Sequence, residues 1–294
     1  MPNFVDLHTH STASDGVYTP AELLHKAKEA GLAVIALTDH DTTDGLEEAK
    51  QAAQTVSIDL IPGIEINTDI AGGEVHVLGY FLEYGRPAFQ AVLKVLRNAR
   101  VRRGQRMVEL LNEHGVHITW KRVREIAQGS VGRPHVAEAL LEAGYVQTIN
   151  EAFEKYIGSS CFAYVPRYKL TPVDAVHLIN SANGLPVIAH PIGIPGLDKL
   201  RSWLPDLCKA GMVGLETYYG QYTPEEEREL LALAMEYHLI PTGGSDFHGP
   251  GIHSTPLGGH YVPFTAVESL RAEAAKRHGR TPPSFELPTP EHEQ

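Results

Sequence analysis

The sequence predicts an α/β protein built as a parallel barrel, or a near relative of one, with a helical insertion. Short apolar runs alternate with helical patterns along most of the chain, and this alternation is typical of βα units. It stops between about Tyr84 and Tyr168, where helical patterns dominate. A chain of 294 residues with 43% hydrophobic content can bury one large domain that carries such an insertion.

The predicted strands are roughly seven short apolar runs, and their alternation with helices indicates a parallel sheet. The fourth run follows a turn at Ala71, Gly72 and Gly73. In chain order, the predicted strands are residues 5–8, 33–37, 58–61, 74–81, 186–189, 213–216 and 239–242.

Three predicted helices share one start signal, in which Thr and Pro are followed two residues later by an acidic side chain. In the helix expected over residues 20–30, Thr19 is the N-cap, Pro20 the first helical residue and Glu22 the partner in a capping box, with Gly31 as the stop. The same signal recurs at Thr171-Pro172-Val173-Asp174 and at Thr223-Pro224-Glu225-Glu226. We therefore expect helices to begin at all three positions.

The change of pattern along the chain predicts three parts. The barrel is expected to comprise residues 1–83 and 169–280. Residues 84–168, with long helical patterns at 88–114 and 134–143, are expected to form a helical insertion that caps the active site. The Pro-rich end, residues 281–294, is expected to be a loose tail.

Composition limits the partners and the compartment. A net charge of −11 argues against binding long nucleic acid, which requires clustered Lys and Arg, although bound divalent cations can still attract a small anion. The chain shows no signal-peptide pattern and no apolar run long enough to span a membrane. Cys161 and Cys208 form neither a disulfide framework nor a zinc motif. We expect a cytoplasmic protein with no membrane contact and no obligate protein partner.

Unusual His, Asp and Glu residues fall where the predicted strands end. In parallel α/β folds the loops at these ends form the concave functional face, and imidazole together with carboxylate suits Mn²⁺, Fe²⁺ or Zn²⁺. A lone His is more often a core or surface residue, so the prediction depends on the joint pattern. The proposed ligands of a cluster of divalent ions are His8, His10, Asp15, His40, Glu65, His76, His190, Asp246 and His248.

The segments around these residues resemble, in order, the motifs of the polymerase and histidinol phosphatase (PHP) superfamily. The segments are VDLHTHSTASDG, ALTDHDT, PGIEI, VHVLGY, VIAHP and GGSDFHG, which extend from the N-terminal strand to about residue 250. The resemblance implies a metal-dependent phosphoesterase on a distorted (β/α)₇ barrel.

The resemblance also implies how the ligands divide among two to three divalent ions, with Mn²⁺ expected first and Zn²⁺ or Fe²⁺ as alternatives. The first ion would take His8, His10, Glu65 and Asp246. A second would share the bridging Glu65 with His76 and His190, and a third would take Asp15, His40 and His248. Asp15 stands where some family members have His, which weakens the expectation of the third ion.

Two segments of the insertion resemble a subgroup that acts on nucleotides, namely a 3′,5′-nucleotide bisphosphate phosphatase and a related 5′→3′ exonuclease of short oligonucleotides. These segments are GRPH at residues 132–135 and VPRYKLTP at residues 165–172. Guanidinium groups can bind a phosphate in a bidentate manner. The candidates to bind a phosphate that is not cleaved are Arg133, Arg167 and Lys169, with Ser130 and His135 as further donors.

Simpler interpretations exist for several of these side chains. Arg133 and His135 could cap the helix after Pro134, and Lys169 could be a solvated surface residue. The run Arg100, Arg102, Arg103 and Arg106 is interpreted as a solvated or intrahelical ion-pairing face.

The predicted reaction is attack on phosphorus by a hydroxide that bridges two ions, which metal coordination makes available near neutral pH. The predicted substrate is a nucleoside 3′,5′-bisphosphate such as phosphoadenosine phosphate, giving AMP and phosphate. Glu65, Asp246 and His248 are the predicted catalytic residues, and His248 or a metal-bound water is the hypothetical proton donor.

Three alternatives remain. The same pocket could serve a 5′→3′ exonuclease of short RNA or DNA. Amide hydrolysis would usually require a strand-borne bridging Lys, and none is found. A non-catalytic accessory module would normally have lost ligands, whereas all the proposed positions hold metal-competent groups.

Overall fold

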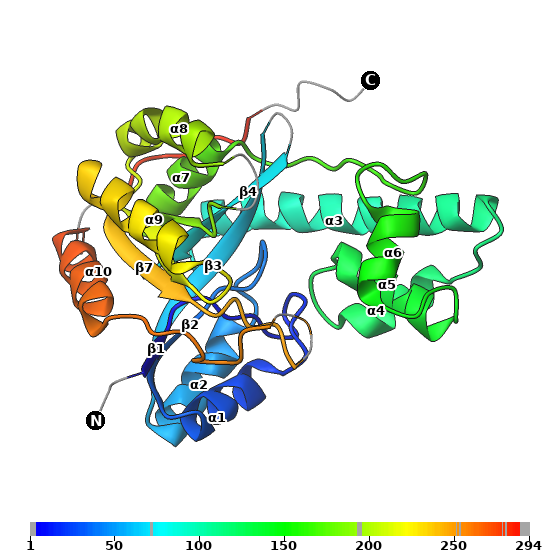
Figure 1. Cartoon of the computed structure of the whole chain (residues 1–294), viewed down its shortest axis with the longest axis horizontal. Coiled ribbons are helices and arrows are strands. Elements are labelled where there is room, and N and C mark those ends of the chain that lie inside the picture. The colour runs from blue at the N-terminus through cyan, green and yellow to red at the C-terminus, as the bar shows by residue number, and fades with distance from the viewer. Residues whose placement is uncertain are drawn as a thin grey trace.

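The computed structural model of the chain is an α/β barrel that is nearly closed, as the sequence predicted (Figure 1). The structure describes residues 4–70, 73–192, 196–250, 252, 254–277, 279 and 281–288. A single seven-stranded sheet runs in chain order from β1 to β7. Its strands are β1 Phe4–Asp6, β2 Leu32–Leu37, β3 Asp59–Ile70, β4 Gly73–Tyr80, β5 Leu185–Ala189, β6 Gly214–Tyr219 and β7 Ile240–Gly244.

The first and last strands meet near their C-terminal ends. The Leu7 N–H donates to the Gly243 carbonyl at 3.2 Å, and Thr9 pairs with Phe247 in a parallel bridge. The buried Asp6 carboxylate accepts from the backbone N–H and the hydroxyl of Ser245. These bonds provide hydrogen-bond partners for polar groups at the two edges of the sheet, which would otherwise be exposed.

The strand β4 departs from the parallel arrangement that the alternation of strands and helices indicated, because it is antiparallel to both β3 and β5. The connection between β3 and β4 is too short for the crossover that parallel strands require, so the two strands form a hairpin. Residues 71 and 72 of the predicted turn lie outside the described residues. As a consequence β3 is longer than expected, and Glu65 lies within this strand instead of just past it.

The predicted helix starts are confirmed. Capping boxes are present at Thr19, Thr171 and Thr223, each followed by Pro in the first turn. The helices outside the insertion are α1 Pro20–Glu29, α2 Leu46–Val56, α7 Pro172–Ser181, α8 Leu197–Ala210, α9 Pro224–Glu236 and α10 Phe264–Arg277.

The segment predicted as an insertion is helical. Figure 1 shows α3 running from the barrel to a separate group of short helices. They are α3 Pro87–Glu113, α4 Trp120–Ala127, α5 Arg133–Glu142 and α6 Ile149–Ala152, followed by a π turn at Phe153–Ile157. Buried side chains of this group, including Met107, Val123 and Leu140, form a hydrophobic cluster of their own. Its role as a substrate-selecting cap stays a prediction.

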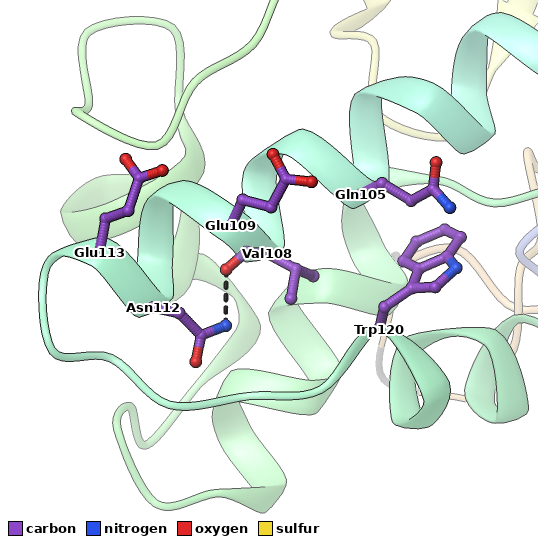
Figure 2. Close-up of a pocket in the computed structure, with 6 residues that line it drawn as sticks. All are labelled: Gln105, Val108, Glu109, Asn112, Glu113 and Trp120. Atoms are coloured by element: carbon purple, nitrogen blue, oxygen red, sulfur yellow. Dashed lines mark hydrogen bonds between the residues drawn. The ribbon is translucent and has the colours of Figure 1, made fainter.

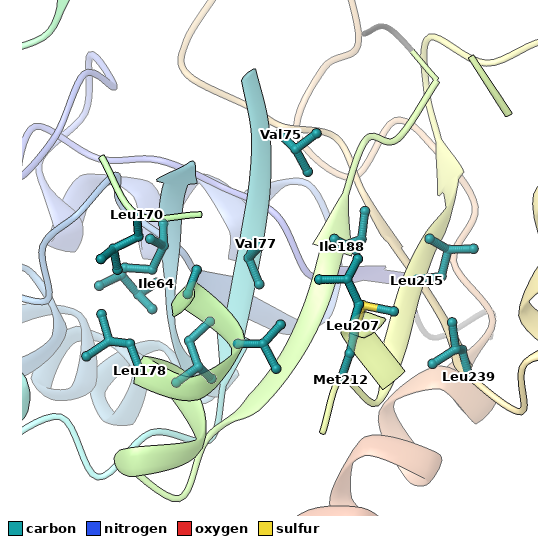
Figure 3. Close-up of a cluster of buried hydrophobic side chains, with 14 of the residues drawn as sticks. Ile64, Val75, Val77, Leu170, Leu178, Ile188, Leu207, Met212, Leu215 and Leu239 are labelled. Atoms are coloured by element: carbon teal, nitrogen blue, oxygen red, sulfur yellow. The ribbon is translucent and has the colours of Figure 1, made fainter. Parts of the chain in front are cut away.

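The largest hydrophobic cluster packs the outer face of the sheet against helices (Figure 3). Ile188 of β5 and Leu215 of β6 lie in one cluster with Leu178 of α7 and Leu207 of α8. Each such side chain, when fully buried, contributes about 1.5–3 kcal/mol relative to exposure. This packing holds in place the strands that carry the site.

Of the predicted C-terminal tail, residues 281–288 contact the rest of the protein, and residues 289–294 lie outside the described residues. Within residues 281–288 there is no helix or strand, but Phe285 and Leu287 pack against the largest hydrophobic cluster. The Tyr168 hydroxyl also donates to the Pro288 carbonyl at 2.9 Å. In the described part of the chain, no helix combines the length and apolar character needed to cross a membrane.

Candidate metal centre

One buried carboxylate, that of Glu65, lies at the centre of the predicted ligands. Its Oε2 atom is 3.2 Å from His8 Nε2, 3.2 Å from His10 Nε2 and 3.0 Å from His40 Nδ1. Its Oε1 atom is 2.7 Å from His76 Nδ1 and 3.0 Å from His190 Nε2. The two oxygens therefore face different sets of imidazoles, as a bridging carboxylate would.

The carboxylates of Asp246 and Asp15 also lie beside these imidazoles. Asp246 Oδ1 lies 3.3 Å from His8 Nε2 and 3.2 Å from His10 Nε2. Asp15 lies 3.4 Å from His248 Nε2 and 3.8 Å from His40 Nε2. All the metal ligands proposed from the sequence thus converge in one place.

These residues fit divalent ions. Three sets of potential ligand atoms each lie within 4.8 Å of one another. They are His8, His10, Glu65 and Asp246; His10, Asp15, His40 and His248; and His40, Glu65 and His76.

Several of the converging atoms are buried but form no hydrogen bond, among them His8 Nε2, His40 Nδ1, Glu65 Oε2 and Asp15 Oδ1. Buried polar atoms are normally hydrogen-bonded. Nitrogen and oxygen lone pairs that face a common point without a bond are what a cation with mixed His and carboxylate ligands requires.

The charges in the centre oppose the effect of burial. Burial would lower the pKa of His10 and of His76, but hydrogen bonds and the negative charges of neighbouring carboxylates raise it to about 10 for His10 and about 9 for His76. Although burial raises the pKa of Glu65, the positive charges of the imidazoles around it hold that pKa well below its usual range. For His40 burial dominates and lowers the pKa to about 4. The carboxylates thus favour positive charge at this point, whether a proton or a metal ion carries it.

A hydrogen-bonded loop places Asp15. The buried Asp39 carboxylate, at the end of β2, accepts from the Ser11 N–H at 2.8 Å, the Ser11 hydroxyl at 2.7 Å and the Ser14 hydroxyl at 2.6 Å. These bonds fix the loop between β1 and α1. The Ser130 N–H of the insertion donates to the Ala13 carbonyl of the same loop at 2.9 Å, so the insertion contacts the loop that carries Asp15.

A cluster of basic side chains lies beside the metal centre. We call Arg100, Arg103, Arg133, Arg167 and Lys169 the basic cluster. Arg100 and Arg167 donate to one oxygen of Asp41, the residue after His40, at 2.7 and 3.1 Å. Lys169 and Arg133 pair with Glu74 at 2.7 and 3.2 Å.

Two residues connect the basic cluster to the ligand His76. The Asn67 side chain is 2.7 Å from His76 Nε2 and also accepts from Arg100. Glu74, which pairs with Lys169, lies 3.8 Å from the same His76 nitrogen. The basic cluster is therefore separated from the metal centre by a single layer of side chains.

The Arg103 guanidinium contacts no carboxylate among the residues that the structure describes. Arg103 is 7% exposed and forms no hydrogen bond or ion pair with any residue that the structure describes. Burial and the positive charges of Arg167, Arg100 and Arg133 lower its pKa well below the usual value. Nearby, Arg167 Nε and the Ser130 hydroxyl are buried without hydrogen-bond partners. A buried guanidinium among others is costly unless an anion compensates it.

The interpretation of the arginine run as a solvated or ion-pairing face is wrong for Arg100 and Arg103. Both are buried, because α3 turns this side toward the barrel. Arg106 behaves as expected and pairs with Glu109 and Glu113 at the surface. The sequence held a weak signal, since residues three apart on a helix share a face, but not which face would be buried.

The other substrate-binding candidates occupy mixed positions. The Lys169 side chain is buried, being 3% exposed, so the solvated alternative is wrong. His135 Nδ1 accepts from the Gly132 N–H at 2.9 Å, as the capping alternative supposed. The Arg133 guanidinium also stacks over the rings of Phe153 and Tyr164.

A pocket lies on the insertion (Figure 2). It has a volume of about 530 Å³ and is lined by residues of α3 together with Trp120 at the start of α4. The Asn112 side chain donates to the Val108 carbonyl at 2.7 Å on its wall. No residue of the metal centre or the basic cluster lines this cavity.

The PHP domain family model matches residues 6–181 of the chain. The chain belongs to the PHP domain family. A 5′-3′ exoribonuclease from Haemophilus influenzae is 35% identical to this PHP protein over 251 residues, which are 85% of this chain and 92% of the relative. A 3′,5′-nucleoside bisphosphate phosphatase from Chromobacterium violaceum is 33% identical over 254 residues, which are 84% and 88% of the two chains.

A solved structure from Bifidobacterium adolescentis, named as a metal-dependent phosphoesterase, superposes with a TM-score of 0.83 at 30% identity. The superposition covers 92% of this chain and 96% of that one. The family and fold expected from the sequence motifs are confirmed, and the protein is a metal-dependent phosphoesterase of the PHP family.

We expect divalent ions to stabilise the folded chain, because the ligands converge only in the native state. After chelation, Mn²⁺ at about 100 times its dissociation constant should stabilise by about 2.7 kcal/mol. In a chain of this size the melting temperature should then rise by roughly 5–10 °C, which differential scanning calorimetry can measure. An unchanged melting temperature, with full activity after chelation and dialysis, would contradict a metal centre.

Proposed function

We propose that this PHP phosphoesterase hydrolyses the 3′-phosphate of nucleoside 3′,5′-bisphosphates, with Mn²⁺ as its metal and the nine convergent residues as ligands. The observation that carries the proposal is the basic cluster beside the metal centre. A substrate with two phosphates can present one to the metals and the other to these guanidinium and ammonium groups. The unpaired guanidinium of Arg103 is the strongest single element of this second site.

The bound ions would supply an activated water and would neutralise charge on the phosphoryl oxygens. The chain itself provides the rest. The two oxygens of Glu65 are directed to different imidazoles, so Glu65 connects the two sets of imidazoles and fixes their relative positions. Arg103 and Arg167 bind the uncleaved phosphate through charge-assisted hydrogen bonds, and the Ser130 hydroxyl adds a donor. Binding at two anchors orients the scissile ester before reaction.

The geometry favours His248 as a ligand over a proton donor. Its Nδ1 atom lies 2.9 Å from the Asp246 carbonyl, which can only accept, so the Nδ1 atom carries a hydrogen. In the neutral ring Nε2 then has a lone pair, and it is directed toward Asp15 at 3.4 Å. The tautomer that suits this bond is therefore the one that can bind a metal.

A second candidate function is the 5′→3′ hydrolysis of short oligonucleotides. It is favoured by the relative from Haemophilus influenzae, which is named a 5′-3′ exoribonuclease and is 35% identical to this chain, against 33% for the bisphosphate phosphatase. The basic cluster would then bind the 5′-phosphate, and a longer 3′ extension would leave the site.

The two functions can be separated with three substrates. We expect kcat/KM for a nucleoside 3′,5′-bisphosphate to exceed that for a 3′-monophosphate by at least about tenfold, because losing one charged hydrogen-bond partner costs more than about 1.4 kcal/mol. Activity on 5′-phosphorylated oligonucleotides should fall as length grows, because a chain of net charge −11 does not attract a long polyanion. Much higher kcat/KM on oligonucleotides of about five or more residues would replace the phosphatase by the exonuclease.

A further inference from the structure

Glu216, on β6, is a buried carboxylate behind the metal centre that the sequence motifs do not single out. It is 0% exposed. Its Oε1 atom lies 3.1 Å from His8 Nδ1, and its Oε2 atom accepts from the backbone N–H of His190 at 2.7 Å. Among the residues that the structure describes, no Lys or Arg pairs with it. Burying a carboxylate without a cation is unfavourable. The position of Glu216 is therefore best explained by a role of its two hydrogen bonds.

The bond to His8 selects one tautomer of that ring. His8 Nε2 is directed at Glu65 Oε2 and Asp246 Oδ1, at 3.2 and 3.3 Å. A carboxylate on the opposite nitrogen accepts the Nδ1 hydrogen and leaves the Nε2 lone pair directed at the centre. Carboxylate, histidine and metal in this order form an arrangement that strengthens the imidazole as a ligand.

The bond to His190 holds a strained backbone. His190 has φ of 25° at the end of β5, a conformation unusual for a residue with a side chain. The bond to Glu216 fixes its peptide group, and in this position His190 Nε2 lies 3.0 Å from Glu65 Oε1. The His8 and His190 rings are stacked, with centroids 5.6 Å apart.

We propose that Glu216 is a positioning residue of the metal centre. It does not bind an ion itself. It fixes the tautomer of His8, a ligand on the Glu65 Oε2 side, and the backbone of His190, a ligand on the Oε1 side, so one carboxylate orients ligands of both halves. This inference rests on the proposed metal centre but not on the proposed substrate.

The test is Mn²⁺ binding to the chelated full-length protein, measured by isothermal titration calorimetry without substrate. Glu216→Gln keeps the size of the side chain but offers one oxygen to two donors. We expect its Mn²⁺ affinity to fall by about 10- to 100-fold. The matched control is Leu215→Ala, which alters the residue next to Glu216 on β6, whose buried side chain packs in the largest hydrophobic cluster and contacts none of the proposed ligands.

Leu215→Ala is expected to lower the melting temperature, because it leaves a cavity in the core, while keeping most of the Mn²⁺ affinity. Wild-type affinity in Glu216→Gln would overturn the proposal, and so would an equal loss in both variants, because that would indicate general loosening of the barrel. Substrate plays no part in the measurement, so failure here is distinct from failure of the bisphosphate assignment.

A measurement on the wild-type chain covers the case in which Glu216→Gln does not fold. In the Zn²⁺-loaded protein labelled with ¹⁵N-histidine, we expect the His8 ring to carry its hydrogen on Nδ1, protected from exchange by Glu216. A His8 ring protonated on Nε2 in that spectrum would overturn the proposal.

Discussion

Glu65→Gln is expected to lower kcat/KM by about 10³-fold or more and to lower the bound metal content. The Glu65 carboxylate is the only group whose two oxygens face both sets of imidazoles in the described chain. A Gln side chain offers one oxygen and no charge, so it cannot bridge two ions. Metal-ion stabilisation of the transition state amounts to several kcal/mol, and each 1.36 kcal/mol is a factor of ten in rate.

The measurement combines elemental analysis after dialysis with steady-state kinetics at saturating Mn²⁺. Glu236→Gln is a suitable control, since it removes a carboxylate that pairs with Arg201 at the surface. The control should keep wild-type metal content and rate. A Glu65→Gln enzyme with full metal content and wild-type kcat/KM would refute the bridging role.

Arg103→Met is expected to raise KM for a nucleoside 3′,5′-bisphosphate by about 30-fold to several thousand-fold. Removing a buried charged hydrogen-bond partner costs about 2–5 kcal/mol of binding, and about 1.4 kcal/mol is tenfold. Metal content should not change, because Arg103 contacts none of the proposed ligands. Methionine fills similar space without the uncompensated charge, so the melting temperature of the free enzyme should stay equal or rise.

The control is Arg106→Met, one turn along the same helix, whose guanidinium pairs with Glu109 and Glu113 at the surface. This variant should bind the bisphosphate normally. A loss of melting temperature in Arg103→Met without any change in KM would mean that this arginine serves the packing of α3. Loss of metal would mean that the basic cluster belongs to the metal centre.

Local signals were read correctly from the sequence. The three capping boxes depend on residues at most three positions apart, and all are present. The apolar runs matched strands of the barrel because burial of alternating side chains is a local pattern. His8 and His10 lie on one side of their segment for the same reason.

Pairings between distant segments were not predicted. The direction of β4 follows from its short connection to β3, but the residue pattern of β4 does not differ from that of a parallel strand. Tyr168 and Pro288 form a hydrogen bond across 120 positions of the chain, and no local pattern indicates it. Asp41 likewise accepts from Arg100 and Arg167, which lie far from it in the sequence.

By itself the sequence determined the fold class, the PHP family and the set of residues that meets around Glu65, because strand ends in a barrel must converge and the motifs mark those ends. Only the tertiary structure decided which arginines of α3 are buried and that Glu216 contacts His8 and His190. The sequence positions of arginines in a helix do not show which face of the helix is buried. The position of a Glu in a strand likewise does not show which residues lie opposite it. Those contacts depend on how the strands and helices pack against one another, which the local sequence does not encode.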